Sequence, residues 1–411
     1  MLQVKKRHVP VNVRQSGDPG IKMLLSTRVR KSPFWHKSIE AGAWACTVYN
    51  HMYHPRAYAK PEEGGLMREY EHLTQHVSLW NVSVERQIRV KGPDAADFVN
   101  LVITRDVHKK LPAGMARYVI LCNEKGGIIN DPVLLRVKED EFWFSISDSD
   151  VLLWLQGVNT FAKYDVEIDE IDVAPMQMQG PKAKDMAVEL FGEDILNVKY
   201  YGLYEGEVAG RSVVISRTGF SGEVGYEIYL RDATIHADEV WDHLLEVGKK
   251  YNMMVIAPSH IRRIEAGIMS YGQDMDIETN PYEVGLDWQV DLTKDNFIGK
   301  EALAKIKEKG VEQILVGIRM KGEPITWYNE DFWLIGDAET GKEVGFVTSA
   351  FWSPALDSNI AMGFVPVKFA DLGTQLVVHL PKDGAVSAEV VQKPFKDPNK
   401  EIPSANFATA I

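Results

Sequence analysis

The stretch RTGFSGEVGYEIYL, residues 217–230, places one acid, Glu223, among three glycines within seven residues. Closely spaced glycines indicate tight turns or a close approach of the backbone to something bulky. Alternation resumes directly afterwards, with Tyr226 and Ile228 on one face and Glu227 on the other, which predicts a strand. From this pattern alone, Glu223 is either a solvated acid at a hairpin tip or a carboxylate that meets a ligand.

A second acid, Asp131, interrupts the apolar run GGIINDPVLL between Ile129 and Val133. The neighbouring Pro132 has no backbone N–H, so we expect an edge or a bulge at this point of the strand. A carboxylate in such a run is unfavourable unless it is solvated, hydrogen-bonded or facing a ligand. Asp131 is therefore the second acid that could do chemistry.

Composition narrows the class of protein. The chain has 411 residues, of which 45% are hydrophobic and 25% charged, which predicts a globular protein of two or three domains. It contains no apolar run near the roughly 20 residues that cross a bilayer, and we expect no signal peptide, because residues 1–37 are basic and polar. The net charge of −12 argues against a nucleic-acid surface and favours a neutral or cationic substrate.

Cysteine usage points to a reducing compartment. Cys46 and Cys122 are the only cysteines, and no C-x-x-C or His pair has ligand spacing. We therefore expect no disulfide framework, no metal site and a cytoplasmic location. Residues 1–37 carry nine Lys or Arg against a single acid, Asp18, which predicts a surface arm. Such an arm could also dock on another subunit or on an anionic cofactor tail.

Periodicity predicts mixed helices and strands. Residues 86–172 have the strand and helix order of a split βαβ sandwich, and helices are expected at 233–250 and 258–270. From about residue 311, short strands at 8–12 residue spacing predict a small all-β domain. The sequence has no G-x-G-x-x-G opening a helix, no P-loop and no G-x-S-x-G, so dinucleotide binding, phosphoryl transfer and esterase chemistry lose weight.

Six segments in order carry a family resemblance that covers nearly the whole chain. They are NEKGGIINDPVLL, RTGFSGEVGYEIYL, RIEAGIMSYGQDMD, NPYEVGLDWQVDLTKDNFIGKEAL, VGFVTSAFWSPALDSNIAMGFVP and KPF. In this the chain resembles the glycine-cleavage T-protein (aminomethyltransferase) superfamily. The resemblance implies an α+β, three-domain aminomethyltransferase-like fold with ferredoxin-like α/β domains and a C-terminal β-barrel-like domain. The implied domains are 1–85 with 174–254 (folate-binding), 86–173 with 255–295 (ferredoxin-like) and 296–411 (barrel-like).

The resemblance also implies tetrahydrofolate as cofactor, bound in the middle of the three domains. Glu223 would then accept two parallel hydrogen bonds from the pterin, which a carboxylate does well. Asp131 would be the catalytic acid beside the reactive nitrogen of the folate. Tyr118, Arg263 and Trp352 complete the folate-binding residues that the resemblance implies.

The chain also departs from the aminomethyltransferases. Ser259 and His260 stand where their helix begins with an Arg-Asp pair, so the chain lacks the Arg that would contact the glutamyl part of folate. LWNVSVERQ replaces their FDVSHM segment, which changes residues expected near the reacting atoms. No feature specific for a lipoyl-protein partner is present in the sequence.

RVRKSPFWHKSIEAGAWACTVYNHM, LWNVSVERQ, CNEKGGIINDPVLL and FSISDSDVLLW are instead similar to the dimethylsulfoniopropionate demethylase branch. That branch implies methyl transfer from dimethylsulfoniopropionate to N5 of tetrahydrofolate, which yields methylmercaptopropionate and 5-methyltetrahydrofolate. Aromatic faces attract a sulfonium, although each aromatic could equally pack in a core. The predicted substrate-binding residues are Trp44, Tyr49, Tyr53, Trp80 and Glu85.

The expected partner is a small-molecule methyl donor, without nucleic acid or membrane, and the sequence leaves a homodimer open. Three alternatives remain. A demethylase of another methylated amine or ether and a glycine-cleavage aminomethyltransferase fit the shared segments. A non-catalytic folate-binding module is the weakest alternative, because DNFIGKEAL lacks the cysteine of the KGCYxGQE-type motif.

Overall fold

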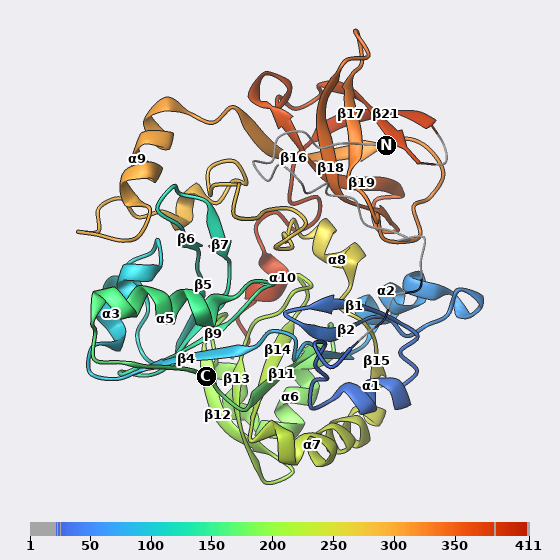
Figure 1. The fold of residues 1–411 in the computed structure, drawn as a ribbon. Coiled ribbons are helices and arrows are strands. Elements are labelled where there is room, and N and C mark those ends of the chain that lie inside the picture. The colour runs from blue at the N-terminus through green and yellow to red at the C-terminus, as the bar shows by residue number, and fades with distance from the viewer. Residues whose placement is uncertain (1–21, 23, 25, 382–383, 409–411) are drawn as a thin grey trace.

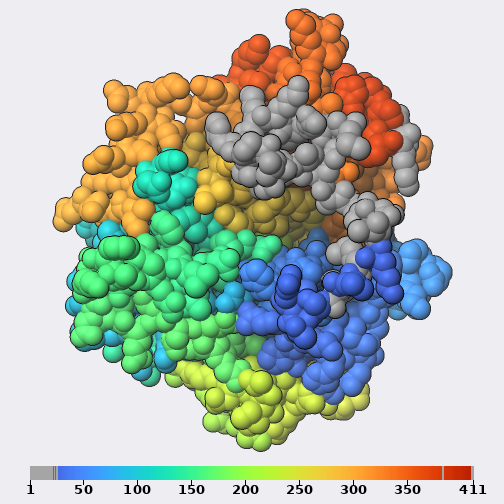
Figure 2. Space-filling model, in the orientation of Figure 1, coloured from blue at the N-terminus to red at the C-terminus, as the bar shows by residue number. Residues whose placement is uncertain are grey.

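A computed structural model describes residues 22, 24, 26–381 and 384–408, so most of the predicted basic arm lies outside the described residues. The chain forms two α/β layers and a β-barrel around a common centre (Figure 1). In the space-filling view, the barrel residues (orange and red) lie above the segments of the two α/β layers (Figure 2). The fold is the α+β, three-part arrangement expected from the family resemblance.

The first layer is an antiparallel five-stranded sheet covered on one face by two helices. In spatial order its strands are β10 (Glu167–Glu170), β4 (Gln87–Lys91), β9 (Glu141–Ser145), β8 (Val133–Lys138) and β5 (Met115–Tyr118). Helices α3 (Ala95–Val102) and α5 (Val151–Ala162) contribute buried residues to the core that also holds Phe142 and Phe144 of β9. The short α4 (Val107–Lys110) follows α3.

The second layer is a six-stranded sheet. Its strands come from segments that precede and follow those of the first layer in the sequence. Its order is β12 (Leu203–Val208), β13 (Arg211–Ser216), β14 (Gly225–Arg231), β11 (Val173–Gln179), β3 (Ser78–Asn81) and β15 (Met254–Val255). Helices α6 (Ala183–Phe191) and α7 (Ala233–Gly248) pack on one face. Helices α1 (Trp35–Glu40) and α2 (Gly65–Gln75) precede this sheet in sequence.

The two sheets face each other through the sides that carry no helix. Trp143 of β9 and Tyr229 of β14 share one buried cluster there. The alternation along β14 places Tyr226 and Ile228 in the core under α6 and α7, whereas Glu227 is on the opposite side. The period of two therefore aims Glu227 toward the other layer and the centre of the molecule.

The third part is a closed six-stranded barrel. Its order is β16 (Gln313–Met320), β19 (Ser358–Pro366), β18 (Glu343–Ser353), β17 (Trp333–Asp337), β20 (Gln375–Leu380) and β21 (Gly384–Val391), and β21 pairs back with β16. Helix α9 (Lys300–Lys309) leads into it, and α10 (Glu401–Ser404) follows it. Five of these strands follow the spacing expected from the sequence, whereas β17 was not anticipated.

Two elements near the centre differ from the sequence-based expectation. The helix predicted over 258–270 is only α8 (His260–Glu265), because Gly267 has φ of +64° and the chain leaves the helical path. A hairpin of β1 (Ala45–Tyr49) and β2 (Met52–Ala57) forms where no strands were predicted. Asn50 and His51 turn it with φ of 49° and 60°, as a type I′ turn requires.

At Asp131 the sequence predicts an edge or a bulge within one strand, whereas the structure interrupts the strand there. Strand β7 (Ile128–Asn130), which pairs with β6 (Leu121–Cys122), ends just before Asp131, and β8 begins after Pro132. Asp131 therefore lies in the connection between two sheets rather than within a strand of either. Across the described residues, no helix combines the length and apolar character needed to cross a membrane.

Candidate functional site

A cavity of about 390 Å³ lies at the centre of the molecule. Its wall is built by the β1–β2 hairpin, both α/β layers, the loop 266–271 after α8, and the segment 393–403 after the barrel. This volume is in the range of small-molecule sites, which are commonly formed where domains meet. Four of the ten predicted site residues line it: Tyr49, Glu85, Tyr118 and Asp131.

Asp131 is a buried acid with two hydroxyl donors. Tyr118 Oη donates to its Oδ2 at 2.9 Å, and Ser147 Oγ donates to its Oδ1 at 2.6 Å. Burial raises the pKa of Asp131 to about 7, although both hydrogen bonds oppose the rise. The charge on this carboxyl group therefore changes near neutral pH, in a position open to a ligand.

Two further acids, Glu85 and Glu227, line the same cavity. Glu227 accepts hydrogen bonds from Gln177 (2.7 Å), Thr218 (2.8 Å) and Tyr229 (2.6 Å). Burial raises the pKa of Glu227, and burial together with the charge of Glu227 raises the pKa of Glu85 well above its usual range. With Asp131, the cavity thus has three carboxyl groups of raised pKa, and a bound cation would stabilise their negative charge. Asp397, on the segment after the barrel, lines the cavity as well.

Glu223, the acid first singled out in the sequence, does not line the cavity. Its Oε1 accepts a hydrogen bond from Arg262 Nε at 2.7 Å, and both side chains are buried. Arg262 itself lines the cavity, and its Nη1 has no hydrogen-bond partner among the described residues. A role of Glu223 in binding folate stays a prediction; the structure gives it a role in holding the glycine-rich loop against α8.

The hairpin contributes Tyr49, His54 and Arg56 to the cavity wall. The rings of Tyr49 and His54 are 5.7 Å apart. Burial, and then the charges of Asp131 and Glu85, raise the pKa of Tyr49 well above its usual range, so its hydroxyl stays protonated. His54 and Arg56 were not among the residues predicted from the sequence, although their spacing of two residues would have placed them on one face of a strand.

Three of the predicted aromatic residues lie elsewhere. Trp44 stacks on Trp327 with ring centroids 5.5 Å apart, and Tyr53 stacks on Trp35 at 5.1 Å. Trp80 is completely buried, and its Nε1–H donates to Ser78 Oγ at 2.8 Å. None of the three lines the cavity, so their contact with a substrate stays a prediction, and packing explains each of them.

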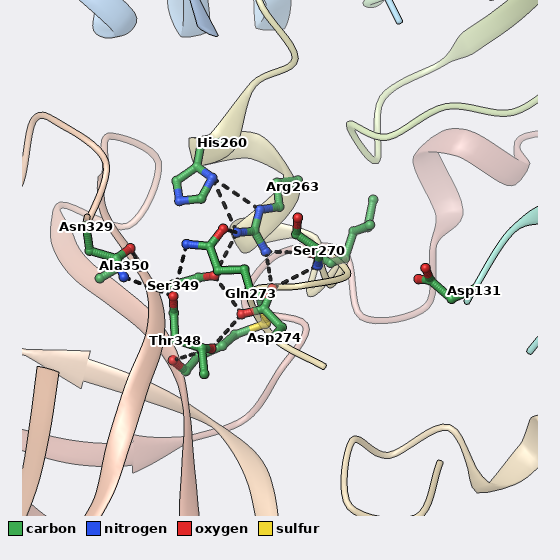
Figure 3. Close-up of polar contacts among 12 residues, drawn as sticks. Asp131, His260, Arg263, Ser270, Gln273, Asp274, Asn329, Thr348, Ser349 and Ala350 are labelled. Atoms are coloured by element: carbon green, nitrogen blue, oxygen red, sulfur yellow. Dashed lines mark hydrogen bonds and ion pairs between the residues drawn. The ribbon is translucent and has the colours of Figure 1, made fainter. Parts of the chain in front are cut away.

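Arg263 points away from the cavity into a polar cluster between α8 and the barrel (Figure 3). Its Nη1 pairs with Asp274 Oδ2 at 2.5 Å, and its Nη2 donates to Ser349 Oγ at 2.7 Å. Asp274 also accepts the hydrogen bond of Ser270 N–H at 2.9 Å. The pair therefore shapes loop 266–271, a wall of the cavity, while Asp131 lies apart from the cluster (Figure 3).

Two other positions discussed in the sequence have structural explanations. Ser259 is the N-cap of α8, and its Oγ accepts the Arg262 N–H at 3.2 Å. Its short side chain suits that role, whereas an Arg would not cap the helix. Trp352, predicted to contact folate, lies on β18 against the apolar cluster under α8 and does not line the cavity.

The segment that follows the barrel brings three cations to the cavity: Lys393, Lys396 and Lys400. Burial lowers the pKa of Lys393, whose Nζ lies 3.4 Å from the Val284 carbonyl oxygen. Trp288, 55% exposed, lines the cavity as well, with the Arg105 guanidinium 5.5 Å from its ring. An elongated ligand with an anionic end fits this combination of acids, aromatic surface and lysines.

Comparisons with known proteins agree with this geometry. Residues 34–294 match the model of the GCVT N-terminal domain, and residues 314–397 match that of the glycine cleavage T-protein C-terminal barrel domain. A dimethylsulfoniopropionate demethylase of Ruegeria pomeroyi is 34% identical over 87% of this chain and 94% of its own. An aminomethyltransferase of Thermotoga maritima is 35% identical over 89% of this chain and 98% of its own.

A solved structure supports the fold. The glycine cleavage system aminomethyltransferase T from Bartonella henselae superimposes with a TM-score of 0.78, at 24% identity over 89% of this chain and 98% of that one.

Proposed function

Because the chain belongs to the glycine cleavage T-protein family, we propose that it is a demethylase that transfers a methyl group from dimethylsulfoniopropionate to N5 of tetrahydrofolate. The general activity follows from the family: the protein is a tetrahydrofolate-dependent transferase of methyl or aminomethyl groups. The proposal concerns which one-carbon donor it uses.

The proposal is carried by one end of the cavity, where an aromatic ring lies beside two carboxyl groups. Tyr49 stands there beside the carboxyl groups of Glu85 and Asp131. An aromatic face and nearby carboxylates stabilise a sulfonium, and a neutral thioether gains nothing from them. Such a site binds the charged donor more tightly than the neutral product, so the product can leave.

The acceptor side rests on Glu227 rather than on Glu223. Glu227 lines the cavity, and three neighbouring hydrogen bonds fix its orientation, whereas Glu223 is paired with Arg262. One acceptor position of Glu227 Oε1 remains for a pterin N–H, since Gln177 uses the other. We assign the carboxylic ends of folate to Lys393, Lys396 and Lys400.

The protein supplies position and charge for the reaction. When bound, tetrahydrofolate provides the N5 lone pair that takes the methyl group, and the sulfonium already carries a neutral leaving group, so no strong general acid is needed. Tyr118 and Ser147 hold the Asp131 carboxylate, which would stabilise the positive charge that develops on N5 and pass the N5 proton to water as 5-methyltetrahydrofolate forms. Enclosure between the sheets and the barrel keeps both reactants in attack geometry and excludes water.

One assay tests the proposal. The purified protein is incubated with tetrahydrofolate and, in turn, with dimethylsulfoniopropionate, glycine betaine, dimethylglycine and the aminomethyl-lipoyl protein. We expect 5-methyltetrahydrofolate from the sulfonium. A product of 5,10-methylenetetrahydrofolate from the aminomethyl donor alone would identify a glycine-cleavage enzyme, and methyl transfer from an amine alone would identify another demethylase.

A further inference from the structure

One face of the β1–β2 hairpin forms a row of side chains along the cavity. Residues two apart on a strand share a face, so His54 and Arg56 are directed to the same side. The register pairs Tyr49 with Met52 and Thr47 with His54, which adds Tyr49 to that face. At about 3.3 Å per residue, the backbone of Arg56 is roughly 13 Å along the strand from the Tyr49–Met52 pair, so the long Arg56 side chain must reach toward Tyr49 before one short donor can contact both.

The two ends of this row differ in charge. At one end, Asp131 and Glu85 act on Tyr49. The hairpin tip is anchored there, because Asn50 Nδ2 donates to the Val84 carbonyl oxygen at 2.9 Å. The other end carries the Arg56 guanidinium, beside the barrel residue Tyr328.

Arg56 is a half-buried cation in the cavity wall. In the described part of the chain, no carboxylate forms an ion pair with it. Its Cζ lies 4.1 Å from the centroid of the Tyr328 ring, and Tyr328 Oη donates to the Arg56 carbonyl oxygen at 2.8 Å. A cation–π contact covers the face of a guanidinium and leaves its N–H edge able to bind an anion.

His54 stands between the two ends. It is 6% exposed, and its Nδ1 has no hydrogen-bond partner among the described residues. Burial, and then the charge of Arg56, lower the pKa of His54 to about 3, so the ring is neutral and able to donate one hydrogen bond. A buried polar atom without a partner is costly unless a ligand or water satisfies it.

We propose that Arg56, with His54 beside it, binds the carboxylate of a zwitterionic methyl donor whose onium group lies at the Tyr49 end of the row. This inference rests on the proposed function, which assigns that end to the cation. Dimethylsulfoniopropionate carries both groups on one short chain. A simple methylated amine or aryl ether without an anionic group leaves Arg56 unpaired, so Arg56 selects for donors that are also acids.

The carboxylates of folate have other partners. Lys393, Lys396 and Lys400 line the cavity from the segment after the barrel, separate from the hairpin. Arg56 instead lies on the same face of the hairpin as Tyr49, the end of the row to which we assign the donor cation. Its substitution should therefore change the affinity for the donor and leave the affinity for folate unchanged.

The test is calorimetric binding of matched ligands to the full chain and to Arg56→Gln. The ligands are dimethylsulfoniopropionate, its methyl ester, which keeps the sulfonium but lacks the charge of the acid, and tetrahydrofolate. The unsubstituted protein should bind the acid roughly 10- to 100-fold more tightly than the ester, because a guanidinium forms charge-assisted hydrogen bonds with a carboxylate. In Arg56→Gln that preference should disappear through weaker binding of the acid, while the ester and folate bind as before.

Retained binding of the ester and of folate also shows that Arg56→Gln is folded. Arg319→Gln removes the same charge from an exposed position on the barrel and should leave all three affinities unchanged. Arg56→Lys should recover only part of the preference, because an ammonium lacks the planar fork. Equal losses for acid and ester, or a loss confined to folate, would overturn the assignment of Arg56.

The same acid and ester comparison with glycine betaine and dimethylglycine separates this inference from the proposed function. If the protein transfers no methyl group from the sulfonium but Arg56→Gln abolishes the acid preference for an amine donor, the function fails and the inference stands. If the unsubstituted protein transfers a methyl group from the sulfonium but binds every acid and ester alike, the function stands and the inference fails.

Discussion

Arg262 and Glu223 form a buried ion pair, with Arg262 Nε 2.7 Å from Glu223 Oε1. Arg262 Nη2 also donates to the Gly222 carbonyl oxygen at 3.2 Å. The glycine-rich loop between β13 and β14 is thereby fastened to α8. A Cβ at Gly222 would lie 2.7 Å from Ala266 Cβ, so only glycine allows this close approach of loop and helix.

Two acids, Glu223 and Glu227, are candidates for binding folate, and the ion pair of Glu223 with Arg262 predicts that they behave differently. Glu227→Gln should raise the dissociation constant of tetrahydrofolate roughly 10- to 100-fold, because a charge-assisted hydrogen bond is lost. Glu223→Gln should leave that constant within a few-fold and lower the free energy of unfolding by about 1–3 kcal/mol, since the partner of Arg262 loses its charge. Calorimetry and urea denaturation of both variants give the answer, and the reversed pattern would return folate binding to Glu223.

Asp131 predicts a pH dependence of the methyl-transfer rate. Its pKa is about 7, and the carboxylate that stabilises positive charge exists only above that value. The value of kcat/KM, which reports the free enzyme, should therefore rise as pH increases through about 7 and fall toward lower pH. Asp131→Asn should lower kcat/KM by roughly 100-fold and remove this rise, because no titrating group remains at that position.

Values of kcat/KM from pH 5.5 to 8.5 measure the effect of Asp131. Ser147→Ala is a useful companion variant. It removes the 2.6 Å hydrogen bond that stabilises the ionised form, so the midpoint of the profile should move to higher pH. An Asp131→Asn profile that still rises through pH 7 would assign the titration to another group.

Aromatic residues that looked equivalent in the sequence should behave differently. Tyr49→Leu should weaken binding of dimethylsulfoniopropionate roughly 2- to 30-fold and leave binding of the neutral thioether product nearly unchanged, because only the cation gains from the aromatic face. Trp44→Leu is the matched control, since Trp44 stacks on Trp327 outside the cavity. Isothermal titration of both ligands distinguishes the two. Equal weakening of cation and thioether by Tyr49→Leu would mean that the ring only packs.

Substitution of Arg263 should lower the stability of the protein more than its affinity for folate. Arg263→Met leaves Asp274 buried without its charged partner and should lower the free energy of unfolding by roughly 3–5 kcal/mol. Arg263→Lys keeps the charge and should lose less, with the folate dissociation constant almost unchanged. A Lys variant of normal stability in denaturant but with much weaker folate binding would instead place Arg263 in contact with the ligand.

Local pattern alone determined several features of this protein. The period of two after Gly225 predicted β14 and the face on which Glu227 lies, because strand geometry sends alternate side chains to opposite sides. The Asp131–Pro132 step predicted an irregularity of the strand, because proline cannot donate in a ladder, and the structure has an interruption between β7 and β8 there. The order of six segments indicated the family, and through it the two α/β layers and the barrel.

The tertiary structure decided which of these residues meet in the cavity. Glu223 and Glu227 are equally acidic in the sequence, but Arg262 lies 39 residues from Glu223 along the chain and pairs with it only after α8 packs on the loop. Arg263 contacts Ser349 across 86 residues, and the hairpin face with His54 and Arg56 lines the same cavity as the acids Glu85, Asp131 and Glu227. Such contacts depend on how separate layers pack, and local periodicity carries no information about distant partners.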